Sequence, residues 1–112
     1  MAPKSVMGDV AATSAPVPEE ILSVAVYEAL SGREQDSLET MATLLKILSA
    51  AGFSRDFLYK DGSQYVLLRY WKSADARRAA HEDPEVQRCW AKLGNEIRIV
   101  KVFEVLEQVE LP

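Results

Sequence analysis

The segment from Tyr65 to Trp90 holds most of the side chains in this chain that could do chemistry. It contains the only histidine, His81, and an arginine on a predicted strand, Arg69. An imidazole titrates near neutral pH and can move a proton, while a guanidinium can hold an anion. Trp71 and Trp90 offer flat apolar rings. These residue types predict a small cleft surrounded by aromatic, basic and imidazole groups.

Three elements must position these groups. Residues 64–71 alternate in a way that predicts a strand, in which Tyr65, Leu67, Arg69 and Trp71 share one face. Ser73 is a predicted N-cap for a short helix, Ala74 to His81. Asp83 and Pro84 then have the residue types that begin a second helix, which carries Trp90 and ends at Gly94.

The rest of the chain predicts a sheet for this unit to pack on. Strands are expected from Ile21 to Leu30, from Phe53 to Lys60 and from Glu96 to Glu107. Between the first two, a helix has apolar residues at steps of three and four. Ser31 and Glu34 form a predicted capping box at its start, and Gly52 is a predicted left-handed stop. Asp61-Gly62 predicts a hairpin turn.

The resulting order is β-α-β-β-α-β. It predicts an α+β, ferredoxin-like domain with a four-stranded antiparallel sheet and helices on one face. Residues 20–112 make up this domain, and residues 1–19, rich in Ala, Pro and Ser, are predicted to be a flexible tail. An arm that crosses to a partner subunit is the other interpretation of the tail.

Composition excludes several classes of protein. A formal charge of −4 argues against nucleic-acid binding. No apolar run approaches the roughly 20 residues that span a membrane. The single cysteine, Cys89, cannot form an internal disulfide, which favours a reducing compartment, the cytoplasm. One histidine without clustered ligands argues against a metal site.

The sheet face opposite the helices is predicted to be apolar. Large side chains occupy both faces of the strand 64–71, and the first and last strands are rich in Ile and Val. A monomer would expose this surface to water. Two sheets packed face to face in a twofold homodimer would bury it, giving a dimeric α/β barrel.

The pattern formed by Tyr70-Trp71-Lys72-Ser73, His81, Asp83-Pro84 and Trp90 resembles the antibiotic biosynthesis monooxygenase family of dimeric α+β barrels. The resemblance covers roughly Ile21 to Val109. That family includes cofactor-independent oxygenases of phenols, quinol oxygenases, haem-degrading enzymes and members without known activity. The resemblance therefore implies the fold more firmly than the reaction.

For an oxygenase, the resemblance implies a mechanism without metal or cofactor. A phenol or quinol loses a proton, and its anion reacts directly with O₂. His81 would handle the proton and Arg69 would hold the anion. Tyr65 or Tyr27 would bond a ring oxygen. The remaining candidates are two apolar walls and one polar group: Trp71, Trp90 and Asn95.

Other interpretations of these residues stay open. His81 could only stabilise its helix end, Arg69 could only pair with a carboxylate across the sheet, and Arg77 is predicted on a solvated helix face. The chain could then be a dimeric binding or structural module without chemistry, or an isomerase or lyase. Haem degradation is disfavoured, because Cys89-Trp90 stands where a haem-ligating histidine is expected and strand 21–30 lacks asparagine.

Overall fold

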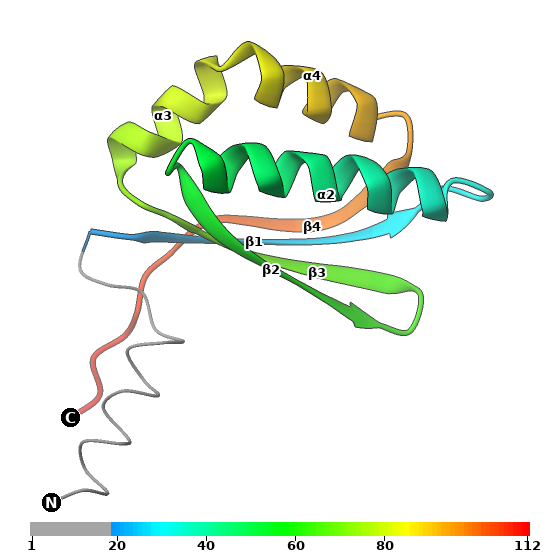
Figure 1. The fold of residues 1–112 in the computed structure, drawn as a ribbon. Coiled ribbons are helices and arrows are strands. Elements are labelled where there is room, and N and C mark those ends of the chain that lie inside the picture. Colours follow the sequence, from blue (N-terminus) through cyan, green and yellow to red (C-terminus); the bar gives the residue numbers. More distant parts are fainter. Residues whose placement is uncertain (1–18) are drawn as a thin grey trace, which may run out of the picture.

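The computed structural model describes residues 19–112 as one layer of helices on one face of a sheet (Figure 1). The elements are β1 (Ile21–Ala29), α2 (Glu34–Ala50), β2 (Ser54–Asp61), β3 (Gln64–Trp71), α3 (Ala74–Glu82), α4 (Pro84–Leu93) and β4 (Ile97–Leu106). The strands are antiparallel in the order β2-β3-β1-β4. The predicted ferredoxin-like fold is confirmed. The predicted tail lies outside the described residues, apart from Glu19.

Helix α2 begins differently from the prediction. Gly32 has a φ of 76°, so the backbone cannot be helical there and Ser31 cannot cap the helix. The N-cap is Arg33, which makes no side-chain capping bond, and the predicted capping box is therefore wrong. The end of α2 follows the prediction, since Gly52 is left-handed with a φ of 72°.

Helices α3 and α4 begin at the predicted caps. The Ser73 hydroxyl accepts a hydrogen bond from the Ala76 amide at 3.0 Å. The Asp83 carboxylate accepts bonds from the amides of Glu85 and Val86 at 2.9 and 3.1 Å. Asp83 is both the C-cap of α3 and the N-cap of α4. The two helices therefore join at one residue, and this junction places His81 beside the start of α4.

Replacing Asp83 by alanine should lower the free energy of unfolding by about 1 kcal/mol, because two amides at the start of α4 lose their acceptor. Urea unfolding followed by circular dichroism measures this change. Asp83→Asn is the matched control, since asparagine is an equally good N-cap and should retain most of the stability. Equal losses in the two variants would show that the cap bonds do not stabilise the protein.

The hairpin turn sets which residues face each other across β2 and β3. Gly62 adopts a φ of 61° in the predicted turn, and Asp61 pairs with Gln64. Each step away from the turn preserves this register, which brings Asp56 opposite Arg69. Strand β4 is less regular, since its pairing with β1 shifts register twice. These irregularities account for the poor alternation of its sequence.

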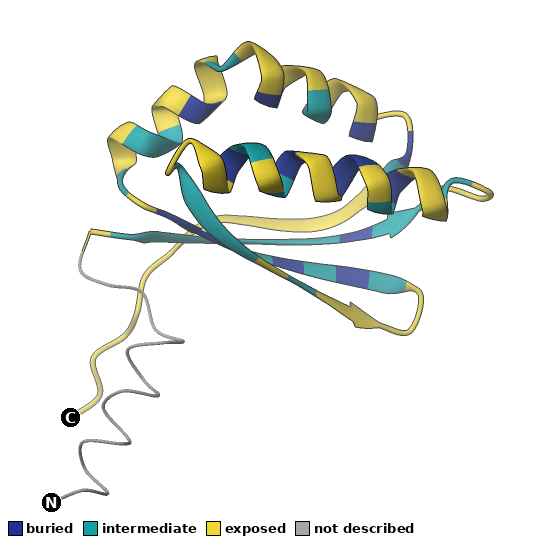
Figure 2. Ribbon diagram, in the orientation of Figure 1, coloured by how far each residue is buried: buried dark blue, intermediate teal, exposed yellow. Residues whose placement is uncertain are grey.

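The helices bury one face of the sheet and leave the other uncovered (Figures 1 and 2). Strand β4 is exposed along nearly its whole length. On the uncovered face, Phe103 of β4 pairs with Val24 of β1 and is 37% exposed. Tyr59 of β2, on the same face, is 58% exposed. The core lies between the sheet and the helices, and its buried members are Tyr27, Met41, Leu44, Leu48, Tyr65, Leu67, Trp71, Ala80, Val86 and Leu93.

Candidate functional site

A cleft between the helix layer and the sheet has two adjoining chambers. The first, the His81 chamber, has a volume of about 150 Å³, and the second, the Tyr27 chamber, about 350 Å³. The chambers share four lining residues: Ala25, Leu67, Arg69 and Trp90. The His81 chamber is also lined by Ser23, Val24, Trp71, Arg77, His81, Val102 and Glu104. The Tyr27 chamber adds Tyr27, Met41, Leu44, Leu93, Gly94, Ile97 and Ile99.

His81 lies at the edge of its chamber between two indole rings. Its ring centroid is 5.9 Å from that of Trp71 and 4.9 Å from that of Trp90. Its Nδ1 lies 2.7 Å from the carbonyl oxygen of Arg77. A carbonyl oxygen only accepts, so Nδ1 carries the proton and Nε2 is the basic nitrogen of the neutral ring. The residue is exposed to solvent and also lines the cleft.

Trp71 is held in place by a bond that crosses the sheet. Its indole Nε1 donates to the Ser23 hydroxyl at 3.0 Å, and that hydroxyl donates to the Glu104 carbonyl at 2.5 Å. Strands β3, β1 and β4 are thereby connected in a row. The ring of Trp71 is 3% exposed and cannot turn away without breaking this row. It provides a rigid wall for the His81 chamber.

Arg69 lies where the two chambers meet. Its Nε donates to Asp56 at 2.5 Å, which confirms the interpretation that Arg69 pairs with a carboxylate across the sheet. Its guanidinium carbon also lies 5.3 Å from the centre of the Trp71 ring. Among residues 19–112, its buried Nη2 finds no hydrogen-bond acceptor. Arg69 is thus both a structural partner of Asp56 and a donor beside the cleft.

Tyr27 contributes a hydroxyl group to the larger chamber. It is 1% exposed, it stacks on Tyr65 at a centroid distance of 5.3 Å, and no described residue bonds its hydroxyl. Burial, followed by the nearby Tyr65 hydroxyl, raises the pKa of Tyr27 to about 12. The phenol is therefore neutral at physiological pH and can donate a hydrogen bond to a ligand.

This raised pKa predicts a loss of stability in alkali. Unfolded tyrosine ionises near pH 10, whereas folded Tyr27 has a pKa of about 12, so stability is complete below pH 10 and falls between the two values. Compared with Tyr27→Phe, the native protein should lose about 1 kcal/mol by pH 11. Urea unfolding of both proteins from pH 8 to 11 measures the difference, since all other titrating groups are shared. Parallel pH profiles would contradict the prediction.

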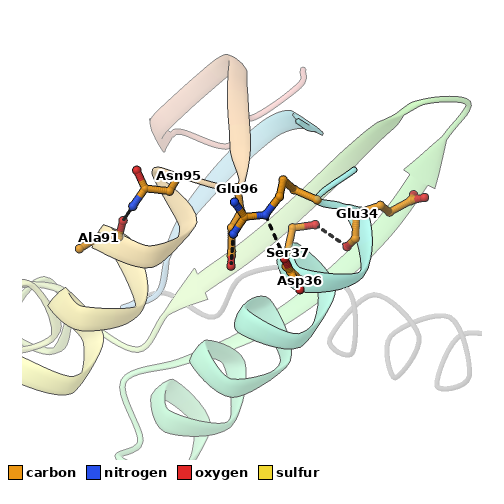
Figure 3. A network of polar contacts seen from close by, with 7 residues as sticks. Glu34, Asp36, Ser37, Ala91, Asn95 and Glu96 are labelled. Carbon is orange, nitrogen blue, oxygen red and sulfur yellow. Dashed lines mark hydrogen bonds and ion pairs between the residues drawn. The ribbon is translucent and has the colours of Figure 1, made fainter. Parts of the chain in front are cut away.

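Two predicted site residues do not line either chamber. The Tyr65 hydroxyl donates to Glu34, which also bonds Lys60, so it is engaged near the start of α2. The Asn95 amide lies 3.5 Å from the carbonyl of Ala91, at the end of α4 (Figure 3). Glu96, labelled in the same view, is fully buried. Its carboxylate lies 3.7 Å from a guanidinium nitrogen of Arg33. Neither Tyr65 nor Asn95 meets His81.

Four polar residues in or beside the cleft were not predicted as part of the site: Arg77, Ser23 and Glu104, which line the His81 chamber, and Asp56, which pairs with Arg69. Arg77, predicted to be solvated, is half-buried and lines the His81 chamber, and only its neighbour Arg78 is exposed and paired with Asp75. Ser23 and Glu104 lie together in the His81 chamber because β1 pairs with β4, and the Ser23 hydroxyl bonds the Glu104 carbonyl. Asp56 could have been found by counting back from the Asp61-Gly62 turn, because the hairpin register puts it opposite Arg69.

The described part of the chain contains no group of three His, Cys, Asp or Glu side chains that could hold a metal ion. No helix between residues 19 and 112 is long and apolar enough to cross a membrane. The hydrogen-bond donors that line the cleft are an imidazole, guanidinium groups and a phenol.

Solved structures with the same arrangement of strands and helices clarify the fold. SnoaB, a cofactor-independent oxygenase from Streptomyces nogalater, matches with a TM-score of 0.67 and 19% identity, over 81% of this chain and 97% of its own. The fold is that of the antibiotic biosynthesis monooxygenases. A Chloroflexus aurantiacus protein assigned to that group matches with a TM-score of 0.66 and 13% identity, over 83% and 97%. No model of a known protein family and no curated protein matches the sequence. At these sequence identities, the similarity to antibiotic biosynthesis monooxygenases shows the fold of this chain and not its reaction.

Proposed function

We propose that this protein is a cofactor-independent monooxygenase that acts on a small aromatic or quinol-like molecule, with His81 as the proton handler. The main support for this proposal is the position of His81. Its Nδ1 is held by the Arg77 carbonyl and its ring lies between Trp71 and Trp90, so Nε2 is the basic atom beside a flat aromatic cleft. SnoaB, a cofactor-independent oxygenase with the same fold, supports the reaction class.

The reaction begins with removal of one proton. A phenol or quinol hydroxyl gives its proton to Nε2 of His81, and the Arg69 Nη2 donor stabilises the oxygen as negative charge develops on it. The electron-rich ring anion then reacts with O₂. The hydroxyl and the attacked ring carbon each lose one hydrogen. One atom of O₂ becomes a carbonyl oxygen on that carbon, the hydroxyl oxygen becomes the second carbonyl, and the other atom of O₂ leaves as water with the two hydrogens. Atoms and electrons balance without a further reductant.

The two chambers fit a flat aromatic substrate. Ligand sites of about 300 to 1,000 Å³ accommodate small organic molecules, and the Tyr27 chamber, with about 350 Å³, reaches this range. Its walls are mainly apolar, with Tyr27 as a hydrogen-bond donor. Trp71 and Trp90 would stack on rings that extend into the His81 chamber.

Oxygen consumption tests the proposal directly. The purified protein, without added metal or cofactor, is given a panel of anthrone-type and quinol-type substrates in an oxygen electrode. We expect uptake above the rate of spontaneous oxidation for at least one of them. No enzyme-dependent uptake across the panel would exclude the oxygenase.

The alternative function is a ligand-binding module without chemistry. It is favoured by the exposure of His81 at the end of α3, where an imidazolium also stabilises the helix dipole. This function predicts that an aromatic ligand binds in the cleft and is recovered unchanged in the presence of O₂. Mass analysis of the recovered ligand separates the two functions.

We also propose that the protein is a homodimer formed by two sheets packed face to face. The support is the uncovered face, where Phe57 and Tyr59 of β2 and Phe103 of β4 are exposed. Isolated apolar residues are common on surfaces, but a continuous apolar face marks an interaction site. A twofold axis would place each face against its own copy.

A cytoplasmic location is the proposal for the compartment. Cys89 is a free thiol, and burial is the largest cause that raises its pKa. Free, unreactive thiols persist where the environment is reducing. Fractionation of the source cells tests this location.

A further inference from the structure

Asp56 and Arg69 form a buried ion pair, and the arginine of this pair lines the cleft. The side chain of Asp56 is 3% exposed and that of Arg69 is 11% exposed. One carboxylate oxygen of Asp56 accepts from Arg69 Nε at 2.5 Å, and the other accepts from the Ser54 hydroxyl at 2.6 Å. Both oxygens are engaged, so the carboxylate is fixed on the helix face of the sheet and holds the guanidinium in place.

The charges around the cleft cancel. Asp56 offsets the charge of Arg69, and Arg77 and Glu104, which both line the His81 chamber, carry opposite charges. With His81 neutral, the cleft has no net formal charge. A ligand that carries a permanent charge must therefore give up its hydration without a net opposite charge to receive it.

Hydrogen-bonding capacity nevertheless remains in the cleft. Among the described residues, neither Arg69 Nη2 nor the Tyr27 hydroxyl has a partner, although both are buried. Buried donors are ordinarily satisfied in native proteins, and an unpaired one indicates a place for a bound molecule. The cleft thus offers donors but no net positive charge.

We infer that Asp56 is a specificity-determining residue, which makes the cleft select an aromatic substrate with an uncharged phenol or carbonyl oxygen over one with a carboxylate. The inference rests on the proposed function for the identity of the site, and it adds the substrate class. The oxygen of the substrate becomes negative only during the reaction, when the Arg69 donor is already in place.

Calorimetric titration with 2-naphthol and 2-naphthoate at pH 7 tests this selectivity. Native protein should bind the uncharged naphthol about tenfold more tightly than the carboxylate, whose charge must be desolvated. In Asp56→Asn, the amide oxygen can still accept from Arg69 and the amide nitrogen can donate to Ser54, but the pair gains a net positive charge. The preference should then shift toward naphthoate by about tenfold or more, because a unit charge acts strongly at close range in a partly buried site.

Asp61→Asn is the matched control. It makes the same change in net charge at the exposed hairpin turn of β2, and the ratio of the two affinities should stay at the native value. An unchanged ratio in folded Asp56→Asn would overturn the inference. The native ratio is a second test that does not depend on any variant: naphthoate bound as tightly as naphthol, or no binding of either, would also overturn it. Binding is measured without turnover, so failure here is distinguishable from failure of the oxygenase proposal.

Discussion

Replacing His81 by alanine should lower enzyme-dependent oxygen uptake by about 10²- to 10⁴-fold, the usual contribution of a positioned general base. The imidazole is the group beside the cleft whose ordinary pKa lies near neutrality, and its Nδ1 bond to Arg77 leaves Nε2 as the base. Without it, the substrate must lose its proton to water. Initial rates in an oxygen electrode, at saturating and at low substrate concentration, give kcat and kcat/KM separately.

Two further measurements separate a base from a structural histidine. Added imidazole should restore part of the rate of His81→Ala, because the vacated space between the indole rings can admit it. Arg78→Ala, on the same helix but exposed and paired with Asp75, should keep the native rate. An unchanged rate in folded His81→Ala would remove this residue from the mechanism and favour the ligand-binding module.

Replacing Leu68 by aspartate should convert the proposed dimer into a monomer. Leu68 lies at the middle of the uncovered face, between Val24 of β1 and Phe57 of β2 in the register of the sheet. A carboxylate there would be buried without a partner between two sheets, at a cost of several kcal/mol, which weakens association by about 10³-fold or more. Sedimentation equilibrium should change from twice the chain mass to the chain mass of 12.5 kDa.

Ala79→Asp is the control for this experiment. Ala79 lies on the exposed side of α3, away from the uncovered face, and should leave the dimer intact. Circular dichroism must show that Leu68→Asp remains folded, which is expected because Leu68 is only half-buried in the isolated chain. A native protein that sediments at 12.5 kDa at micromolar concentration would exclude the proposed dimer.

Local signals in the sequence predicted most of the elements. Ser73, Asp83 and Pro84 act within a few residues along the chain, so the starts of α3 and α4 could be assigned without the fold. The capping box at Ser31 failed for a reason that is also local: the left-handed Gly32 separates Ser31 from the helix. A residue pattern does not state which of two backbone conformations a glycine will take.

The sequence by itself determined the order of the elements, the division of strand β3 into two faces and the aromatic-imidazole content of the cleft. Only the tertiary structure decided most of the contacts between polar groups, although the Asp56–Arg69 pair follows from the hairpin register. The Tyr65 hydroxyl bonds Glu34, and Asn95 lies at the end of α4. Arg77, predicted on a solvated helix face, lines the cleft. The physical reason is that side-chain partners depend on strand register and on how α3 and α4 lie over the sheet, and these are set by long-range packing.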